Sequence, residues 1–242
     1  HHDILSVNGG SVAHYIPQLA QVNPELCGVS FCDLNGQVSS VGDGNQSFCL
    51  QSCSKPLTYC LARELHRQNM APDVHLHVGQ EPSGQSFNAH TLNRENVPHN
   101  PLINAGAIVV ASLIYPNEEP ARRFGAVQEF FRRLSGGFGA IGYDNGVYLS
   151  EKHHADRNIS LAYYMRESGA YDGDQTPSQL MDHLDLYYQC CAITTSCRVV
   201  SVIAATLANR GRCPVSGEQV VDPSIVKDAL SIMYACGMYD YS

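Results

Sequence analysis

Three features are scarce or missing in this sequence, and each excludes a class of protein. No stretch approaches the roughly 18 consecutive apolar residues that a membrane-spanning helix needs. Basic residues number 15 against 23 acidic ones, a formal charge of −8, so no basic stripe for nucleic acid is expected. None of the ten cysteines forms the Cys-x-x-Cys spacing typical of zinc sites. We therefore expect no membrane, no nucleic acid and no metal or other cofactor.

The cysteines occur mainly in apolar segments. Cys27 and Cys32 lie in a predicted strand, and Cys190 and Cys191 are adjacent in a predicted helix. The first residues show no signal-peptide pattern. Reduced, buried thiols in a reducing compartment are therefore the better interpretation. At 242 residues, 44% of them hydrophobic, the chain is long enough to bury a substantial core.

The order of the predicted elements indicates an α+β fold. Residues 26–50 are predicted to form antiparallel strands, with Asn35-Gly36 suited to a type I′ hairpin turn. From about residue 52 onward helices dominate, and strands followed by a helical block are typical of α+β domains. We predict one domain over residues 3–242, without internal repeats. The predicted helices span 57–65, 107–114, 121–134, 159–166, 179–193 and 198–208, separated by loops at 79–88 and 136–146.

Two patterns have simple structural explanations. Gly137-Phe-Gly139-Ala-Ile-Gly142 spells the dinucleotide-binding G-x-G-x-x-G, but it follows a predicted helix instead of a strand. It also precedes Tyr143-Asp-Asn-Gly-Val-Tyr148, which is predicted as turn and strand, so the pattern favours a loop. Arg122-Arg123 and Arg132-Arg133 are most simply the solvated face of the helix over 121–134. Neither pattern is predicted to carry function.

The strongest candidate for chemistry is the pair Ser52 and Lys55. Residues three apart share one face of a helix, so a hydroxyl and an amine can converge where the strands give way to helix. The positive potential of a helix N-terminus opposes protonation of the lysine, which can then act as the base for a serine nucleophile. An isolated S-x-x-K is more often a solvated surface pair, and serine β-lactamases and penicillin-binding proteins use the same pair.

Six ordered phrases make the chain resemble the serine-dependent glutaminase family, most closely its animal mitochondrial, kidney-type members. Without the resemblance, Ala105-Gly106-Ala107 would be a helix face of small residues that another backbone or a substrate can approach closely. The phrases are Tyr15-Ile-Pro-Gln-Leu-Ala20, Leu50-Gln-Ser-Cys-Ser-Lys-Pro-Leu57, Glu81-Pro-Ser-Gly84, Pro98-His-Asn-Pro-Leu-Ile-Asn-Ala-Gly-Ala-Ile108, Asp156-Arg-Asn158 and Cys236-Gly-Met-Tyr-Asp240.

The resemblance implies a β-lactamase/DD-peptidase-like fold, with an antiparallel sheet packed against helices and a largely helical subdomain. It implies hydrolysis of L-glutamine to L-glutamate and ammonia through a γ-glutamyl ester on Ser52. Lys55 would take the serine proton, and Tyr239 matches the family tyrosine that helps to move protons. A nearby cation would lower the pKa of that phenol, and Lys55 is the expected cation.

The resemblance also implies a set of substrate-binding residues. Free glutamine carries an ammonium and a carboxylate that both need partners once water is excluded. Glu151 matches the glutamate that faces the ammonium, whereas Tyr15, Asn104, Asn158 and Tyr187 match the positions that hold the carboxylate and the carboxamide. Simpler explanations exist for four of them: a surface charge for Glu151, a hydrophobic staple for Tyr15, a helix cap for Asn158 and core packing for Tyr187.

The sequence departs from the family at its end. Family members continue with strands that include a Lys-Ser-Gly phrase and a backbone amide that completes the oxyanion hole, and these 242 residues contain no such phrase. Loss of one such donor typically costs about a hundred- to thousand-fold in turnover. The missing donor makes a catalytically silent interaction domain one alternative. A penicillin-recognising hydrolase, which uses the same serine–lysine pair, is the other. The resemblance further implies a mitochondrial or cytoplasmic homo-oligomer, with inorganic phosphate as an activator through a loop at about 84–93.

Overall fold

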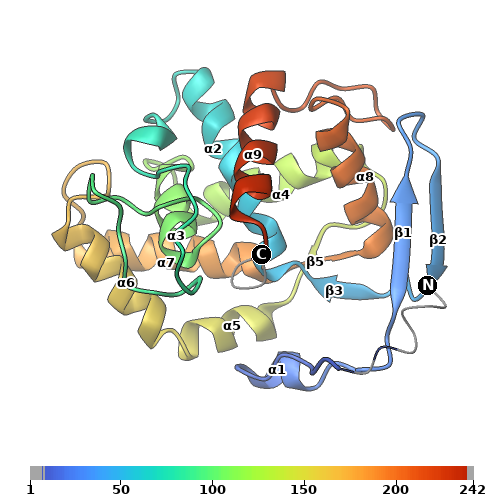
Figure 1. The fold of residues 1–242 in the computed structure, drawn as a ribbon, viewed down its shortest axis with the longest axis horizontal. Helices are drawn as coiled ribbons and strands as arrows, with labels where there is room; N and C mark the ends of the chain where they lie inside the picture. Colours follow the sequence, from blue (N-terminus) through green and yellow to red (C-terminus); the bar gives the residue numbers. More distant parts are fainter. Residues whose placement is uncertain (1–6, 8, 239–242) are drawn as a thin grey trace.

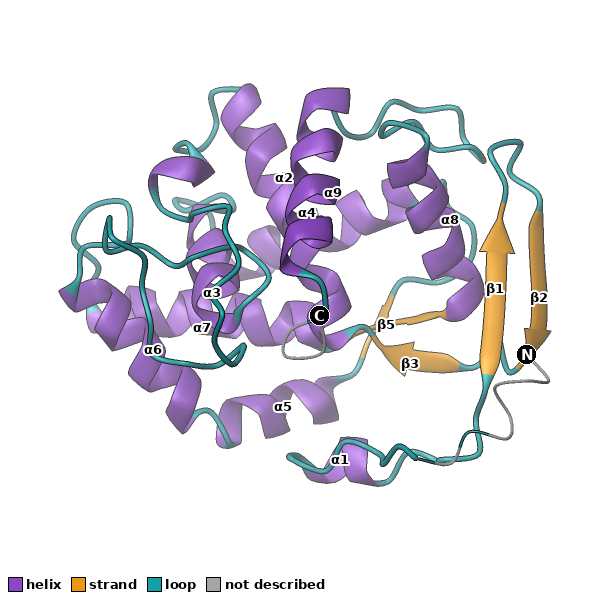
Figure 2. Ribbon diagram, in the orientation of Figure 1, coloured by secondary structure: helices purple, strands orange, loops and turns teal. Residues whose placement is uncertain are grey.

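The computed structural model describes residue 7 and residues 9–238, and its architecture confirms the predicted α+β class (Figure 1). Two antiparallel sheets lie beside a larger helical block, as Figure 2 shows by colour. The helices are α1 (Pro17–Ala20), α2 (Lys55–Arg67), α3 (Asn104–Leu113), α4 (Pro120–Leu134), α5 (Asn145–His153), α6 (Asp156–Glu167), α7 (Pro177–Cys191), α8 (Cys197–Ala208) and α9 (Pro223–Cys236), with short 3₁₀ helices η1 (Gln51–Ser54) and η2 (Val74–Leu76).

The first sheet is a hairpin of β1 (Gly28–Cys32) and β2 (Val38–Gly42), paired from Gly28 opposite Gly42 to Cys32 opposite Val38. Its turn differs from the prediction. Only Gly36 of the turn has a positive φ, 81°, whereas a type I′ turn needs two such residues. Asp33 closes a three-residue loop, because its amide donates to the Gln37 carbonyl at 3.0 Å and its carboxylate accepts from the Asn35 amide at 2.9 Å. The predicted type I′ turn is therefore wrong.

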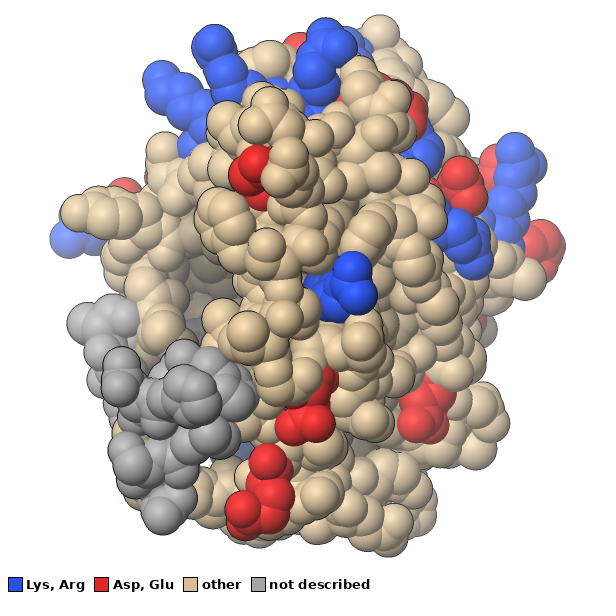
Figure 3. All heavy atoms as spheres, turned by 90° about the vertical axis from the view of Figure 1, so that its right-hand side faces the viewer, with Lys and Arg blue, Asp and Glu red and all other residues tan. Residues whose placement is uncertain are grey.

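The two faces of this hairpin have different surroundings. One face packs on α8 and buries Cys32. The other face exposes apolar side chains, with Phe31 66% exposed and Val29 and Val41 also exposed. Figure 3 views the molecule from this side and shows mostly uncharged atoms.

The second sheet connects the hairpin region to the helical block. It has the order β3 (Ser47–Cys49), β5 (Ile193–Ser196), β4 (Gly142–Tyr143), with all neighbours antiparallel. β5 lies between α7 and α8, in residues partly predicted as helix; α7 ends at Cys191, and Ile193 already begins the strand. The amide of Leu50 donates to the Ile193 carbonyl at 2.8 Å, which fixes the chain just before η1.

Helix α3 forms the centre of the helical block. All ten of its residues are buried, and α2, α6 and α7 pack around it. A Cβ placed on Gly106 would lie 1.9 Å from the backbone oxygen of Asn100. The prediction that small residues here admit another backbone is therefore confirmed.

Most predicted helices occur close to their expected bounds, but α1, α5 and α9 were not predicted. The segment after Tyr143, predicted as turn and strand, forms α5, because the Asp144 carboxylate accepts from the Val147 amide at 3.0 Å and caps a helix. The G-x-G-x-x-G segment lies in the connection between α4 and β4 and reaches the strand only at Gly142, so the predicted loop is confirmed.

The arginine pairs on α4 are not all solvated, which corrects the prediction for Arg123. This residue is 3% exposed and donates to the carbonyls of Ile114, at 2.9 Å, and Ala111, at 2.6 Å. The guanidinium thus satisfies the last turn of α3. Its neighbour Arg122 has a side chain 74% exposed and pairs with Glu118 at 2.9 Å, as predicted.

Several absences hold for the described residues. The ten cysteines, all of them described, are unpaired. Within residues 9–238 no helix is long and apolar enough to cross a bilayer. The same part of the chain contains no group of three or more His, Cys, Asp or Glu side chains that could hold a metal ion.

Candidate active site

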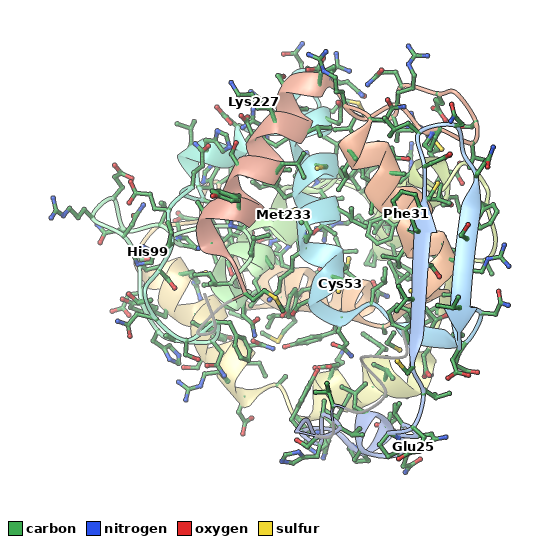
Figure 4. The ribbon with its side chains drawn as sticks, turned by 45° about the vertical axis from the view of Figure 1, so that its right-hand side comes forward. Glu25, Phe31, Cys53, His99, Lys227 and Met233 are labelled. Carbon is green, nitrogen blue, oxygen red and sulfur yellow. The ribbon has the colours of Figure 1, made fainter. Side chains whose placement is uncertain are left out.

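The candidate nucleophile lies where the second sheet passes into α2. Ser52 is in η1, half-buried, one residue after Gln51, whose φ of 50° is unusual for a residue with a side chain. The amide of Lys55 donates to the Ser52 carbonyl. Residues three apart superimpose along a 3₁₀ helix, so the 3₁₀ turn places Ser52 and Lys55 on one face. Figure 4 labels Cys53, the residue after Ser52, at the lower end of α2.

Lys55 is buried in the core, with 2% of its surface exposed. Its Nζ donates to Oδ1 of Asn104 at 2.8 Å. Burial disfavours the ammonium form and lowers the pKa of Lys55 to about 8, although Cys191 and Glu151 act in the opposite direction. About a tenth of this lysine is therefore the free amine at pH 7, and a proton acceptor must be in this form.

Asn104 connects Lys55 to α6. Its Nδ2 donates to Oδ1 of Asn158 at 3.1 Å, and its backbone amide donates to the Phe87 carbonyl at 2.8 Å. Asn158 is not the cap of α6, because the cap is Ala155; the helix-cap alternative is wrong. Both predicted asparagines therefore lie in one hydrogen-bonded chain with the candidate base.

Glu151 is the acidic centre of the site. The phenol of Tyr15 donates to its Oε1 at 2.8 Å and also lies 3.2 Å from Oε1 of Gln51. Burial raises the pKa of Glu151, and the hydrogen bond from Tyr15 and the nearby side-chain amide of Gln51 oppose that shift, followed by the charges of His154 and Lys55. The carboxyl is 9% exposed, so Glu151 is not a surface charge and Tyr15 is not merely a staple.

Tyr187, on α7, completes the group from the helical side. It is 6% exposed, and burial raises its pKa well above the usual value, with further contributions from Cys191, Glu151 and Tyr15. Its ring meets that of Tyr188 edge-on at a centroid distance of 5.6 Å. The structure thus brings Tyr187 near the Tyr15–Glu151 pair while also using it in the core.

Tyr239 lies outside the described residues. Helix α9 runs antiparallel to α2 and packs along it, so the Cys236 end of α9 lies near the Lys55 end of α2 (Figure 1). In the oblique view of Figure 4, α9 with Met233 again runs beside α2.

Sequence reasoning missed Gln51. Its Oε1 accepts from Tyr15, but its buried Nε2 has no hydrogen-bond partner among the described residues. A buried donor without a partner is costly, and this one belongs to the residue directly before the candidate nucleophile, with its side chain near Glu151. The available signal was its position directly before Ser52 in the matching phrase.

A cavity of about 440 Å³ lies between the segment before α3 and the end of α9. Residues 82–85 form one wall, Asn100 and Ile103 before α3 form another, and Cys236 and Gly237 at the end of α9 form a third. Asn104 directly follows the lining residue Ile103 in the sequence, but the predicted site residues that the structure describes do not line the cavity.

Comparison with known proteins identifies the family. The sequence model of the glutaminase family matches residues 10–242. The chain belongs to this family. The mitochondrial liver-isoform glutaminase of Rattus norvegicus is 44% identical over 241 residues, which are 99% of this chain and 39% of the rat protein. The glutaminase of Trichormus variabilis is 42% identical over 243 residues, covering all of this chain and 70% of that protein. The chain thus spans about two fifths of the rat relative.

Solved structures agree with this assignment and show the β-lactamase-like fold of glutaminases. The native form of the protein called Mglu has a TM-score of 0.86 and 29% identity, over 99% of this chain and 56% of Mglu. A second crystal structure of Mglu, described as its L-glutamate binding form, gives the same TM-score over 100% of this chain and 52% of that chain.

Proposed function

We propose that this chain carries the nucleophile, the base and most of the substrate-binding groups of a glutaminase that converts L-glutamine to L-glutamate and ammonia. The observation that carries the proposal is Lys55, a buried amine with a pKa lowered to about 8 on the same face as Ser52. Membership in the glutaminase family favours this reaction over that of a penicillin-recognising hydrolase or a silent domain.

The proposed reaction has two halves. Oγ of Ser52 attacks the side-chain amide carbon of glutamine, and its proton passes to Nζ of Lys55. Collapse of the tetrahedral intermediate breaks the C–N bond, and the departing nitrogen takes a proton to leave as ammonia. Water then attacks the γ-glutamyl ester, which yields glutamate and restores the Ser52 hydroxyl. Tyr239 is proposed to carry protons between these groups, and the Ser52 amide to supply one oxyanion donor.

Substrate binding is proposed to use the two polar clusters of the site. Glu151 receives the α-ammonium, whose positive charge would offset the cost of burying the Glu151 carboxylate. Asn104 and Asn158 keep unused amide hydrogens after their mutual bond, and together with Tyr15 and Tyr187 they hold the α-carboxylate and the carboxamide. Gln51 Nε2 is proposed as a further donor to the substrate.

The setting of the enzyme is proposed on the family relationship. We propose a mitochondrial homo-oligomer, a dimer or tetramer, with inorganic phosphate as an activator acting through the loop at about 84–93. The rat relative is named as mitochondrial, and the relative from Trichormus variabilis keeps a cytoplasmic location as the alternative.

The acyl-enzyme can be tested directly in the full-length protein. Ser52→Ala should abolish release of ammonia from glutamine while glutamate still binds, because attack is lost and the pocket remains. Cys53→Ala, which changes the neighbouring exposed side chain, is the matched control. With the unmodified protein, hydroxylamine should intercept the ester and yield γ-glutamyl hydroxamate. Ammonia release by Ser52→Ala at the normal rate would refute the serine mechanism.

A further inference from the structure

The segment between η2 and α3 contains no helix or strand, and hydrogen bonds close it at its base. The amide of Gly79 donates to the Pro98 carbonyl at 2.8 Å, and that of Glu81 donates to the His99 carbonyl at 2.9 Å. Figure 4 shows His99 at the side of the molecule away from the hairpin. Residues 82–92 extend beyond this closed base.

His90 ties residues 82–92 to α6 by three contacts. Its Nδ1 lies 2.8 Å from Nη1 of Arg157, and its Nε2 lies 2.9 Å from Oγ of Ser160. Its ring also meets that of Tyr164 edge-on, at a centroid distance of 6.0 Å. Most side-chain hydrogen bonds go to backbone groups or water and not to other side chains, so two such bonds and a ring contact from one residue form a specific attachment.

The partners of His90 determine the form of its ring. A guanidinium can only donate, so Nδ1 must be the unprotonated acceptor. The remaining ring proton then lies on Nε2 and is donated to Ser160. The neutral imidazole therefore uses both nitrogens to bridge α6, and no smaller side chain reproduces both bonds.

The two residues of α6 that bind His90 lie on either side of Asn158 in the sequence. Arg157 directly precedes Asn158 and Ser160 follows it by two residues, whereas Phe87, in the same segment as His90, accepts from the amide of Asn104. Residues 82–92 thus connect the start of α3 to the start of α6 beside the Asn104–Asn158 hydrogen bond. The same segment contributes residues 82–85 to the wall of the 440 Å³ cavity.

We propose that His90 is a positioning residue that holds residues 82–92 against α6 and thereby sets the affinity for glutamine. The proposal rests on the proposed function. His90 touches neither Ser52 nor Lys55 in the structure, so its loss should change binding more than chemistry. Ordering of a loop over a bound substrate is a common source of such an effect.

Steady-state kinetics on the full-length protein test the effect on substrate. His90→Ala should raise KM for glutamine about tenfold and change kcat by less than about twofold. Arg94→Ala is the control, because Arg94 is exposed in the same connection and makes no side-chain hydrogen bond or ion pair among the described residues. His90→Asn keeps an acceptor near Nδ1 and should recover part of the loss, whereas His90→Phe keeps only the ring contact and should not.

Trypsin cleavage after Arg94, followed by mass spectrometry, measures the attachment without any assay of activity. His90→Ala should be cleaved at this bond faster than the unmodified protein, and glutamate should slow cleavage of the latter only. Unchanged cleavage, or faster cleavage with an unchanged KM, would overturn the proposal. Faster cleavage together with an unmodified protein that binds neither glutamine nor glutamate would refute the proposed function and leave the attachment of the loop to α6 established.

Discussion

The segment that carries Ser52 and Lys55 and the connection that carries His90 are held in place by different forces. Nine of the thirteen residues of α2 are buried, and burial of a leucine such as Leu57 contributes about 1.5–3 kcal/mol. Residues 82–92 are mostly exposed, and each of their hydrogen bonds contributes only about 0.5–1.5 kcal/mol. The candidate catalytic residues therefore lie on a segment that is fixed by apolar packing. Residues 82–92, by contrast, are held by a few hydrogen bonds.

The largest expected effect lies on the packed side of this comparison. Lys55→Met keeps most of the buried volume but removes the proton acceptor, so kcat should fall by about a thousandfold or more while glutamate binding changes little. Single-turnover assays and calorimetry measure the two quantities. A nearly normal kcat would show that Lys55 is not the base. The packed segment would then no longer be the part of the site that carries catalysis.

The close approach between α3 and the chain just before it, which lies next to both regions, can be broken at Gly106. Gly106→Ala places a methyl group 1.9 Å from the Asn100 backbone oxygen, and we expect a loss of about 3 kcal/mol in the free energy of unfolding. Gly125→Ala is the matched control, because this glycine also lies within a helix and has nothing within 4 Å of the new Cβ. The control should be neutral or more stable by about 0.5–1 kcal/mol. Urea unfolding of both variants gives the comparison, and equal stabilities would contradict it.

Glu151→Gln tests a substrate-binding group that lies on helix α5 and not on residues 82–92. Loss of the charge facing the substrate ammonium should weaken glutamine binding by about 1.5–3 kcal/mol. A glutamine analogue without its α-amino group should bind the unmodified protein and the variant about equally well. If the variant weakens both ligands to the same extent, Glu151 does not face the ammonium.

The smallest effect is the pH dependence set by the burial of Lys55. Because the free amine is the active form and its pKa is lowered to about 8, kcat/KM should rise about fifteenfold from pH 6.5 to 8 and level off above pH 9. Glu151→Gln removes a charge that raises this pKa, so its profile should shift to lower pH. A flat profile between pH 6.5 and 9 would show that Lys55 does not titrate in the catalytic step.

The sequence predicted the elements that depend on local pattern. Helix α8 begins one residue before its predicted start and ends at the predicted Ala208, since its apolar spacing is regular. The turn at Gly36 and helix α5 were predicted wrongly, because the carboxylates of Asp33 and Asp144 select conformations that the letters Asn-Gly do not distinguish. Arg122 and Arg123 are adjacent and identical, and only the position of the end of α3 makes one of them buried.

The residues of the candidate site were predicted from the sequence, but most of the contacts between them were not. The spacing of Ser52 and Lys55 predicted a shared face, and the resemblance supplied Tyr15, Asn104, Glu151, Asn158 and Tyr187. The bond between Lys55 and Asn104 joins residues 49 apart in the chain, and no local pattern contains that information. His90 escaped notice because its partners lie 67 and 70 residues away, in a helix whose own pattern concerns only the core.

The bond between Tyr15 and Glu151 also has a consequence for synthesis of the protein. The two residues are 136 positions apart, and ribosomes add about 5–20 residues per second. Tyr15 is therefore made about 7–27 s before its acceptor exists. During that interval the segment around Tyr15 cannot dock as it does in the finished protein, so the acidic part of the site can form only after α5 has been made.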